Sequence, residues 1–127
     1  MKRIVLRICN SLMELSISHS LKKTGDFQVS SLRSGCGNIA KECADASADI
    51  LLMEAAFNVG ATMVDCQKEV RHLRATCPEC KVILLCDENS APEVARKVVQ
   101  AKKDGLIDDF VYSSVSETYL TAMLSAL

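Results

Sequence analysis

Short apolar runs alternate along this chain with longer stretches in which apolar residues recur every three or four positions. The runs predict strands, and the periodic stretches predict helices. The predicted strands cover residues 4–9, 27–32, 49–54, 81–86 and 107–113. The predicted helices cover residues 12–23, 39–46 and 62–76, the stretch between Pro92 and Gly105, and the residues after Ser116. Five strands alternating with five helices predict a doubly wound α/β domain, with helices on both faces of a five-stranded parallel sheet.

Composition and charge narrow the classes of protein to consider. The chain shows no linker or repeat, so residues 1–127 are expected to form a single domain. Its 15 basic and 16 acidic side chains give a net charge of −1, which offers no surface for direct nucleic-acid contact. No apolar run approaches the roughly 20 residues of a membrane span, and no signal peptide is recognisable. We therefore expect a cytoplasmic protein that contacts no membrane, with its seven cysteines as reduced thiols.

The carboxyl ends of the predicted strands are the candidate site, because ligands bind there in doubly wound folds. The residues at these ends are Cys9, Asn10, Glu54, Cys86, Asp87 and Ser113. We expect them to line one pocket.

The same segments resemble the receiver domains of two-component response regulators, over essentially the whole chain. Residues 49–54 (DILLME) resemble the third strand of that family, which ends in the phosphoaccepting aspartate. Residues 81–86 resemble its fourth strand and residues 108–116 its fifth strand and exit, above all in regulators with a helix-turn-helix output domain. The resemblance implies a flavodoxin-like (βα)5 receiver fold and a signalling module. Whether a DNA-binding domain follows Leu127, which would make the protein a transcription regulator, stays open.

Every position that carries the family's phosphorylation chemistry differs in this chain. By the resemblance, Cys9 and Asn10 replace the acid pair that holds Mg²⁺, Glu54 replaces the acceptor aspartate, Cys86 the hydroxyl residue, Asp87 the small residue after it, and Ser113 the lysine. Phosphoryl transfer needs a cation on the transferring oxygens and a nucleophile at a fixed distance. A thiol and an amide are poor substitutes for the carboxylates that Mg²⁺ prefers. We expect a degenerate, non-enzymatic receiver with weak or absent Mg²⁺ binding and no other cofactor.

Three alternatives remain open. In the first alternative, Glu54 mimics a phosphorylated aspartate. In the second, Glu54 itself accepts a phosphoryl group. The third is a small-ligand or flavin-binding protein of flavodoxin-like architecture, against which residues 9–13 offer no Gly-rich or Ser-rich phosphate cradle. The Gly-Cys-Gly sequence at residues 35–37 lacks the spacing of a dinucleotide loop and predicts a turn.

The partner of such a module is expected on the surface made by the fourth helix, fifth strand and fifth helix: another protein or an attached output domain. Phe110 stands at the family's switch-aromatic position, and the alternative for it is ordinary core packing. The last helix has apolar residues on more than one face. A homodimer interface is therefore predicted from Tyr119, Met123, Val94 and Val98. The alternative is that a C-terminal segment absent from this chain covers that face.

Cys77 and Cys80 have the spacing of half a zinc site or of a redox pair. A structural zinc site needs two further ligands. A reactive redox pair gains its low pKa at a helix N-terminus, whereas this pair follows a predicted helix end. We expect a turn that binds no stoichiometric zinc.

Overall fold

A five-stranded parallel sheet runs through the computed structural model, which describes residues 1–32, 38–56 and 62–127. Its elements are β1 (Lys2–Arg7), α1 (Ser11–Thr24), β2 (Phe27–Leu32), α2 (Ile39–Ala46), β3 (Ile50–Glu54), α3 (Met63–Thr76), β4 (Lys81–Cys86), α4 (Pro92–Lys103), β5 (Asp109–Tyr112) and α5 (Glu117–Ser125). The strand order is β2-β1-β3-β4-β5, and every neighbouring pair is parallel. The predicted doubly wound α/β fold is confirmed. The turn predicted at residues 35–37 lies outside the described residues.

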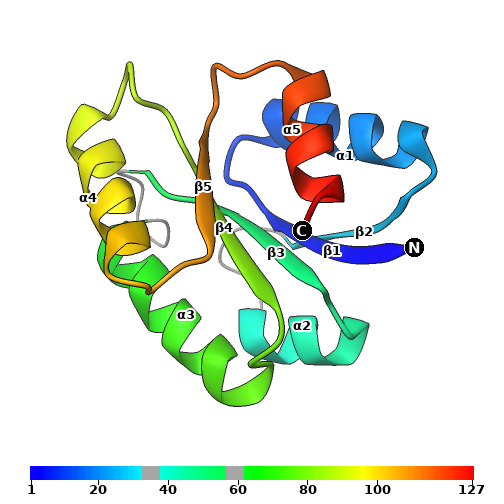
Figure 1. Ribbon diagram of the computed structural model, residues 1–127, viewed down its shortest axis with the longest axis horizontal. Coiled ribbons are helices and arrows are strands. Elements are labelled where there is room, and N and C mark those ends of the chain that lie inside the picture. The colour runs from blue at the N-terminus through cyan, green and yellow to red at the C-terminus, as the bar shows by residue number, and fades with distance from the viewer. Residues whose placement is uncertain (33–37, 57–61) are drawn as a thin grey trace.

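Helices cover both faces of the sheet, with α1 and α5 on one face and α2, α3 and α4 on the other (Figure 1). The inner strands are apolar on both faces because both faces are covered. Leu52 and Ile83 belong to the cluster under α1 and α5, while Leu51 and Val82 belong to the cluster under the other three helices. All four side chains are fully buried. Burial of each contributes about 1.5–3 kcal/mol to folding, so the sheet holds the strand ends in fixed positions.

Polar caps fix where most of the helices begin. The N-cap side chains that accept a hydrogen bond from a backbone N–H are Asn10, Asn38, Thr62 and Ser116. Such a bond satisfies one of the N–H groups that a helix start leaves without a partner. At the other end of α1, Gly25 adopts a left-handed φ of 76°, which glycine tolerates without strain. The cap at Asn10 fixes the start of α1 directly after β1.

β1 is shifted by two residues toward the N-terminus, and β5 is three residues shorter than the sequence predicts. β1 ends at Arg7 instead of continuing to residue 9, because the backbone N–H of Cys9 donates to the Glu54 side chain and not to a neighbouring strand. β5 begins at Asp109, because the Asp108 carboxylate accepts hydrogen bonds from the Val82 backbone (2.8 Å) and the Arg74 guanidinium (2.9 Å). A side chain thus replaces the strand partner at Cys9, whereas the Asp108 backbone N–H still donates to the Val82 carbonyl at 3.0 Å.

The apolar stripe of α4 faces the sheet, which corrects one prediction. Val94 and Val98, assigned from the sequence to a dimer interface, are 6% and 0% exposed and lie in the core.

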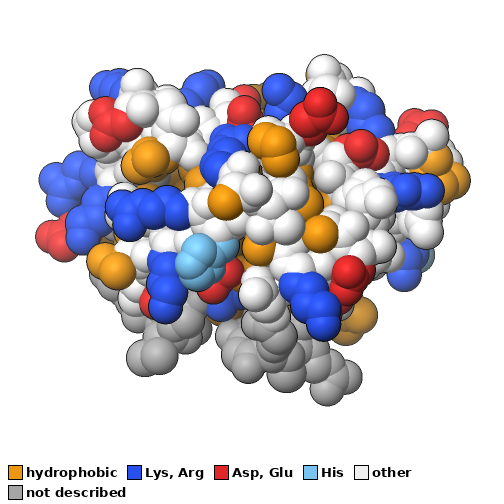
Figure 2. Space-filling view, turned by 90° about the horizontal axis from the view of Figure 1, so that it is seen from below, with side chains coloured by type: hydrophobic (Ala, Val, Ile, Leu, Met, Phe, Trp, Pro, Cys, Tyr) orange, Lys and Arg blue, Asp and Glu red, His pale blue; other side chains and the backbone are white. Residues whose placement is uncertain are grey.

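Seen from the side of α2 and α3, the surface carries many basic side chains and only scattered hydrophobic ones (Figure 2). Within the described ranges, no helix combines the length and the apolar character that a membrane crossing requires.

Candidate functional site

A cleft of about 400 Å³ opens at the carboxyl ends of β1, β3 and β4. Its walls come from the β1–α1 connection, the residues after β3 and the β4–α4 connection. The described residues that line it are Cys9, Asn10, Met13, Glu54, Ala55, Ala56, Asp87, Ser90 and Ala91. The structure therefore brings together four of the six residues predicted to line one pocket: Cys9, Asn10, Glu54 and Asp87.

Glu54, the last residue of β3, is held against the start of the β1–α1 connection. Its Oε1 accepts hydrogen bonds from the backbone N–H of Cys9 at 2.8 Å and of Asn10 at 3.4 Å. Pairing of β1 with β3 in the register Arg7↔Met53 brings these groups side by side. Hydrogen bonds to an ionised carboxylate are among the stronger ones in proteins. The Glu54 carboxylate thus links the end of β3 to the connection that follows β1.

The other polar groups of the cleft are engaged in their own loops. Asp87 Oδ1 accepts the backbone N–H of Asn89 at 3.0 Å and of Ser90 at 3.2 Å. Hydrogen bonds from the side chain and backbone of Ser90, and from the backbone of Asn89, hold the pKa of Asp87 below its ordinary value. Asn10 Oδ1 accepts the Met13 N–H at 3.1 Å as the cap of α1. An amide that caps a helix and a carboxylate that closes a turn are poorly placed to bind a cation as well.

The charge of the cleft is acidic. Among the described residues that line it, the charged ones are Glu54 and Asp87, and no lysine or arginine is among them. Arg7, a buried arginine at the end of β1, is not a lining residue. An anionic ligand such as a phosphoryl group would therefore meet two negative charges in the cleft.

Cys86 and Ser113 do not line the cleft, contrary to the prediction. The Cys86 thiol is 1% exposed and lies 4.0 Å from the carbonyl oxygen of Val111, inside the core. Burial, with smaller contributions from Glu88 and Asp87, raises the pKa of Cys86 to about 11. Successive side chains of a strand point to opposite faces, so Cys86 faces the core under α4 while Asp87 reaches the cleft.

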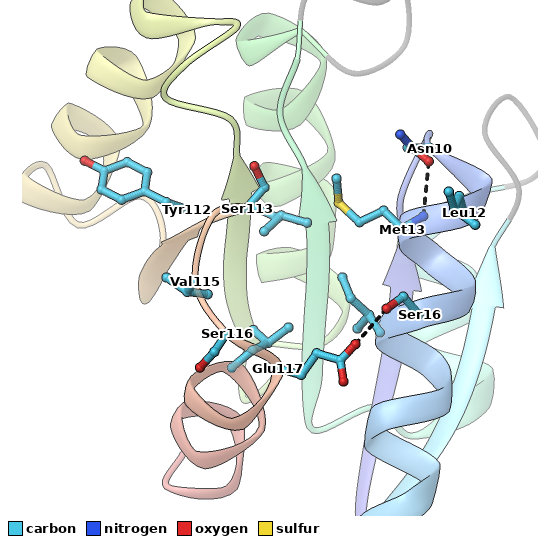
Figure 3. A pocket seen from close by; sticks show the side chains of 12 residues that line it. Asn10, Leu12, Met13, Ser16, Tyr112, Ser113, Val115, Ser116 and Glu117 are labelled. Atoms are coloured by element: carbon cyan, nitrogen blue, oxygen red, sulfur yellow. Dashed lines mark hydrogen bonds between the residues drawn. The ribbon is translucent and has the colours of Figure 1, made fainter.

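Ser113 lies instead in a second, mostly apolar groove of about 350 Å³ between α1 and the β5–α5 connection (Figure 3). Its backbone N–H donates to the Cys86 carbonyl at 2.8 Å. Leu12 and Met13 form the α1 wall, Val115 lies on the opposite wall, and a hydrogen bond of 2.9 Å from Ser16 to Glu117 crosses one end. The sequence alone does not predict this groove, because its two walls come from opposite ends of the chain.

Phe110, the predicted switch aromatic, is half-buried on the α4 side of β5. Its ring meets Tyr112 edge-on, with centroids 5.5 Å apart and planes at 66°, a favourable aromatic geometry. The Lys102 ammonium lies 5.7 Å from the Phe110 ring centroid and forms an ion pair with Asp109 at 2.9 Å. The ring thus contributes to the packing of β5 against α4, and whether it also switches stays a prediction.

Comparison with known proteins identifies the fold. No protein-family model matches the chain, and a search of curated proteins gives no match. Among solved structures, a CheY-like response regulator receiver domain protein from Methanospirillum hungatei superposes with a TM-score of 0.74 at 12% identity, covering 99% of this chain and 92% of that one. RcsB from Salmonella enterica serovar Typhimurium, solved bound to promoter rprA with phosphomimetic BeF3⁻, has a TM-score of 0.73 at 15% identity, covering 99% and 98%.

A LuxR-family DNA-binding response regulator from Staphylococcus aureus is similar to the same extent, with a TM-score of 0.75 at 13% identity and coverage of 99% and 98%. These likenesses confirm, at the level of the fold, the resemblance to receiver domains that was inferred from the strand ends. At such low identity the likeness concerns the fold alone.

Proposed function

We propose that this chain is a receiver-like signalling domain that has lost phosphorylation chemistry and acts by binding another protein. The structural neighbours are receiver domains of response regulators, which supports a signalling module. One observation carries the loss of chemistry: the Glu54 carboxylate, at the position of the acceptor, is tied to the backbone of Cys9 in a cleft whose charged lining is acidic.

The residues of the cleft do not fit the Mg²⁺ ion that receiver domains use. Mg²⁺ demands near-ideal octahedral geometry from carboxylates and waters. One carboxylate oxygen of Glu54 accepts hydrogen bonds from backbone N–H groups, and one of Asp87 accepts hydrogen bonds within its own turn. Cys9 offers a sulfur, which is a soft ligand that Mg²⁺ does not favour. We therefore propose a domain whose function does not depend on a bound metal ion.

The charge of the cleft and the hydrogen bonds at the start of α1 argue against two alternative functions, a mimic of phosphoaspartate and a flavin- or nucleotide-binding protein. A mimic of phosphoaspartate needs a cation to read its charge, and the described lining residues include none. A flavin or nucleotide phosphate needs accessible backbone N–H groups at a helix start. At the start of α1, the N–H groups of Cys9 and Asn10 point to Glu54, and that of Met13 donates to the Asn10 cap.

Incubation with acetyl phosphate and Mg²⁺, followed by intact-mass spectrometry, tests the proposal. We expect no phosphate-sized mass increase in the wild type or in Glu54→Asp, because restoring the shorter carboxylate restores neither the acid pair nor the lysine. Glu54→Gln is the control for labelling at other side chains. A mass increase present in the wild type and absent in Glu54→Gln would refute the loss of phosphorylation.

We infer that the partner binds the groove between α4 and β5, which has a volume of about 490 Å³. Its described lining combines apolar side chains such as Val99 and Tyr112 with the basic Arg96 and Lys103 and the acidic Glu88, which leaves one net positive charge. That combination suits a protein segment with apolar and acidic residues. The partner is a separate cytoplasmic protein or an attached output domain, by analogy with neighbours described as DNA-binding response regulators.

We further propose that the domain forms homodimers through α5. Tyr119 is 57% exposed, and Met123, one turn later, is half-buried beside it. A tyrosine so exposed is typical of interface anchors. With Val94 and Val98 assigned to the core, the proposed interface is smaller than the sequence predicted and rests on α5.

A further inference from the structure

The groove beside Ser113 has the size and the lining of a small-molecule site. Its volume of about 350 Å³ lies within the range of about 300–1,000 Å³ that is typical of ligand pockets in proteins. Its apolar lining residues are Leu12, Met13, Ile17, Leu85, Val115 and Leu120. A mostly apolar lining with a few polar groups is what such pockets share. The groove therefore offers room for an apolar body such as a phenyl ring with a short alkyl chain.

The floor of this groove belongs to the core. Leu85 on β4 and Leu120 on α5 are both buried in the cluster under α1 and α5. Close packing in that cluster fixes the shape of the floor before any ligand binds. Leu12, on the α1 wall, is largely exposed instead. A ligand that covers Leu12 removes apolar surface from water, which favours binding.

The groove continues into the acidic cleft at the strand ends. Asn10 and Met13 line both spaces. The Met13 side chain extends from α1 toward Ser113 (Figure 3). Methionine is unbranched and flexible, so this side chain can move aside when a ligand enters. A single elongated molecule can therefore occupy the groove and the cleft together.

The two ends of this combined space differ in how their negative charge is balanced. At the closed end of the groove, Glu117 accepts a hydrogen bond from Ser16 and shares a neighbouring surface groove with Lys23, whose charge partly compensates its own. In the cleft, Glu54 uses Oε1 for backbone N–H groups, and no described residue donates to its Oε2. The described lining of the groove and the cleft includes no lysine or arginine. The complementary ligand thus carries its positive charge at the cleft end.

An organic ammonium group suits this end better than a metal ion does. Mg²⁺ requires several oxygen ligands in near-ideal octahedral geometry, which the hydrogen-bonded Asn10 and Asp87 side chains do not supply. An alkylammonium group needs only one or two acceptors and keeps water on its remaining N–H groups. Oε2 of Glu54 supplies one acceptor, and the charge of Asp87 adds attraction at longer range.

We propose that the groove and the cleft together bind a small amphipathic amine, with its apolar or aromatic body between α1 and the β5–α5 connection and its ammonium group beside Glu54. An amine carries no phosphate, so the engaged backbone N–H groups at the start of α1 are no obstacle to it. The described lining of this site shares only Tyr112 with that of the groove between α4 and β5. The inference is therefore independent of the proposed protein partner, and its failure would leave the acetyl phosphate result unchanged.

Three probes that differ mainly in charge test the site. They are 4-phenylbutylamine, 4-phenyl-1-butanol and 4-phenylbutyrate, titrated into the isotope-labelled protein at about pH 7, where the amine and the acid are both ionised. Amide chemical shifts give the affinities. We expect the amine to bind roughly threefold more tightly than the alcohol, as for an exposed ion pair, and the carboxylate to bind most weakly. Equal affinities for the three probes, or no saturable shifts with the amine, would overturn the proposal.

Glu54→Gln tests where the ammonium group binds. The variant keeps an acceptor for the Cys9 N–H but removes the charge. Affinity for the amine should therefore fall to that for the alcohol, while affinity for the alcohol stays unchanged. Glu93→Gln is the matched control, since it removes an acid in the first turn of α4 and should leave the preference for the amine intact. A preference for the amine that persists in Glu54→Gln would overturn the proposal.

Leu12→Ser tests the groove, with Leu15→Ser as its matched control. Both leucines lie on α1 and are 78% and 66% exposed, but only Leu12 is among the described residues that line the groove. Leu12→Ser should weaken binding of the amine and the alcohol roughly threefold, because apolar contact is lost, and Leu15→Ser should not. Equal effects of the two substitutions would overturn the proposal. A dimer that binds no amine and dissociates in Leu12→Ser would overturn it in favour of a second copy in the groove.

Discussion

Glu54 illustrates what one additional methylene does at the end of a buried strand. The longer side chain places its carboxylate within 2.8 Å of the Cys9 N–H, so the group becomes a structural acceptor between β1 and β3. The pairing register brings Arg7 opposite Met53 and so fixes the distance that the side chain has to span. One carboxylate oxygen of this cleft-lining residue is therefore already engaged by backbone N–H donors.

Removal of that acceptor should destabilise the fold. Glu54→Ala leaves the Cys9 and Asn10 N–H groups without their partner, and we expect the free energy of unfolding to fall by about 1–2 kcal/mol. Glu54→Gln keeps an acceptor oxygen and should lose less than half as much. Urea unfolding followed by circular dichroism measures both values. Equal losses in the two variants would show that the negative charge, and not the hydrogen bond, matters.

Which strand-end residues face the cleft was only partly predictable. Glu54 and Asp87 were assigned correctly, because both follow apolar strands. Cys86 and Ser113 were assigned to the cleft by position in the chain alone. The side chain of a terminal strand residue follows the alternation of its own strand, and Cys86 accordingly turns to the core beside Val111. A resemblance in sequence position does not settle that direction.

At the scale of elements, α4 shows the limit of hydrophobic periodicity. The spacing of Val94 and Val98 correctly predicts one apolar stripe on a helix. Spacing does not say whether the stripe faces its own sheet or another molecule. Such a stripe packs on the sheet of its own domain, because each valine buried there contributes about 1.5–3 kcal/mol to folding. The bounds of α2, by contrast, follow from the sequence alone, since Asn38 caps its start.

The contact between α1 and α5 should weaken in acid. Hydrogen bonds from Ser20 and Ser16, together with the nearby His19 and Lys23, hold the pKa of Glu117 below its ordinary value of 4.5. A lowered pKa means that the folded state favours the charged form. The contribution of Glu117 to stability is therefore present above the ordinary pKa and is lost as the pH falls through the lowered one.

Melting temperatures of the wild type and Glu117→Gln, measured from about pH 7 to about pH 2, test this linkage. We expect the variant to melt lower at neutral pH and the difference to vanish at the acid end. Glu93→Gln is the matched control, since Glu93 is also an acid in the first turn of a helix. A pH-dependent difference of the same size in Glu93→Gln would assign the effect to the helix dipole instead of the contact with α1.

At the scale of the whole molecule, the order of elements and the doubly wound topology followed from the alternation of apolar runs and periodic stretches. Contacts between segments that are distant in the chain could not be predicted from that alternation. The groove beside Ser113, for example, depends on the packing of α1 against α5. Such contacts arise only when the sheet has set the distances between its helices.

Self-association is the property of the whole molecule that a single substitution can test. Sedimentation equilibrium at micromolar concentration should give a dimer for the wild type and a monomer for Tyr119→Glu, because a charge in the centre of an apolar interface is left without water or partner. The exposed position of Tyr119 means that the substitution itself should change monomer stability by no more than about 0.5 kcal/mol. Val64→Glu is the matched control, since Val64 is 76% exposed on α3, away from α5. A wild type that is monomeric, or a dimer that persists in Tyr119→Glu, would contradict pairing through α5.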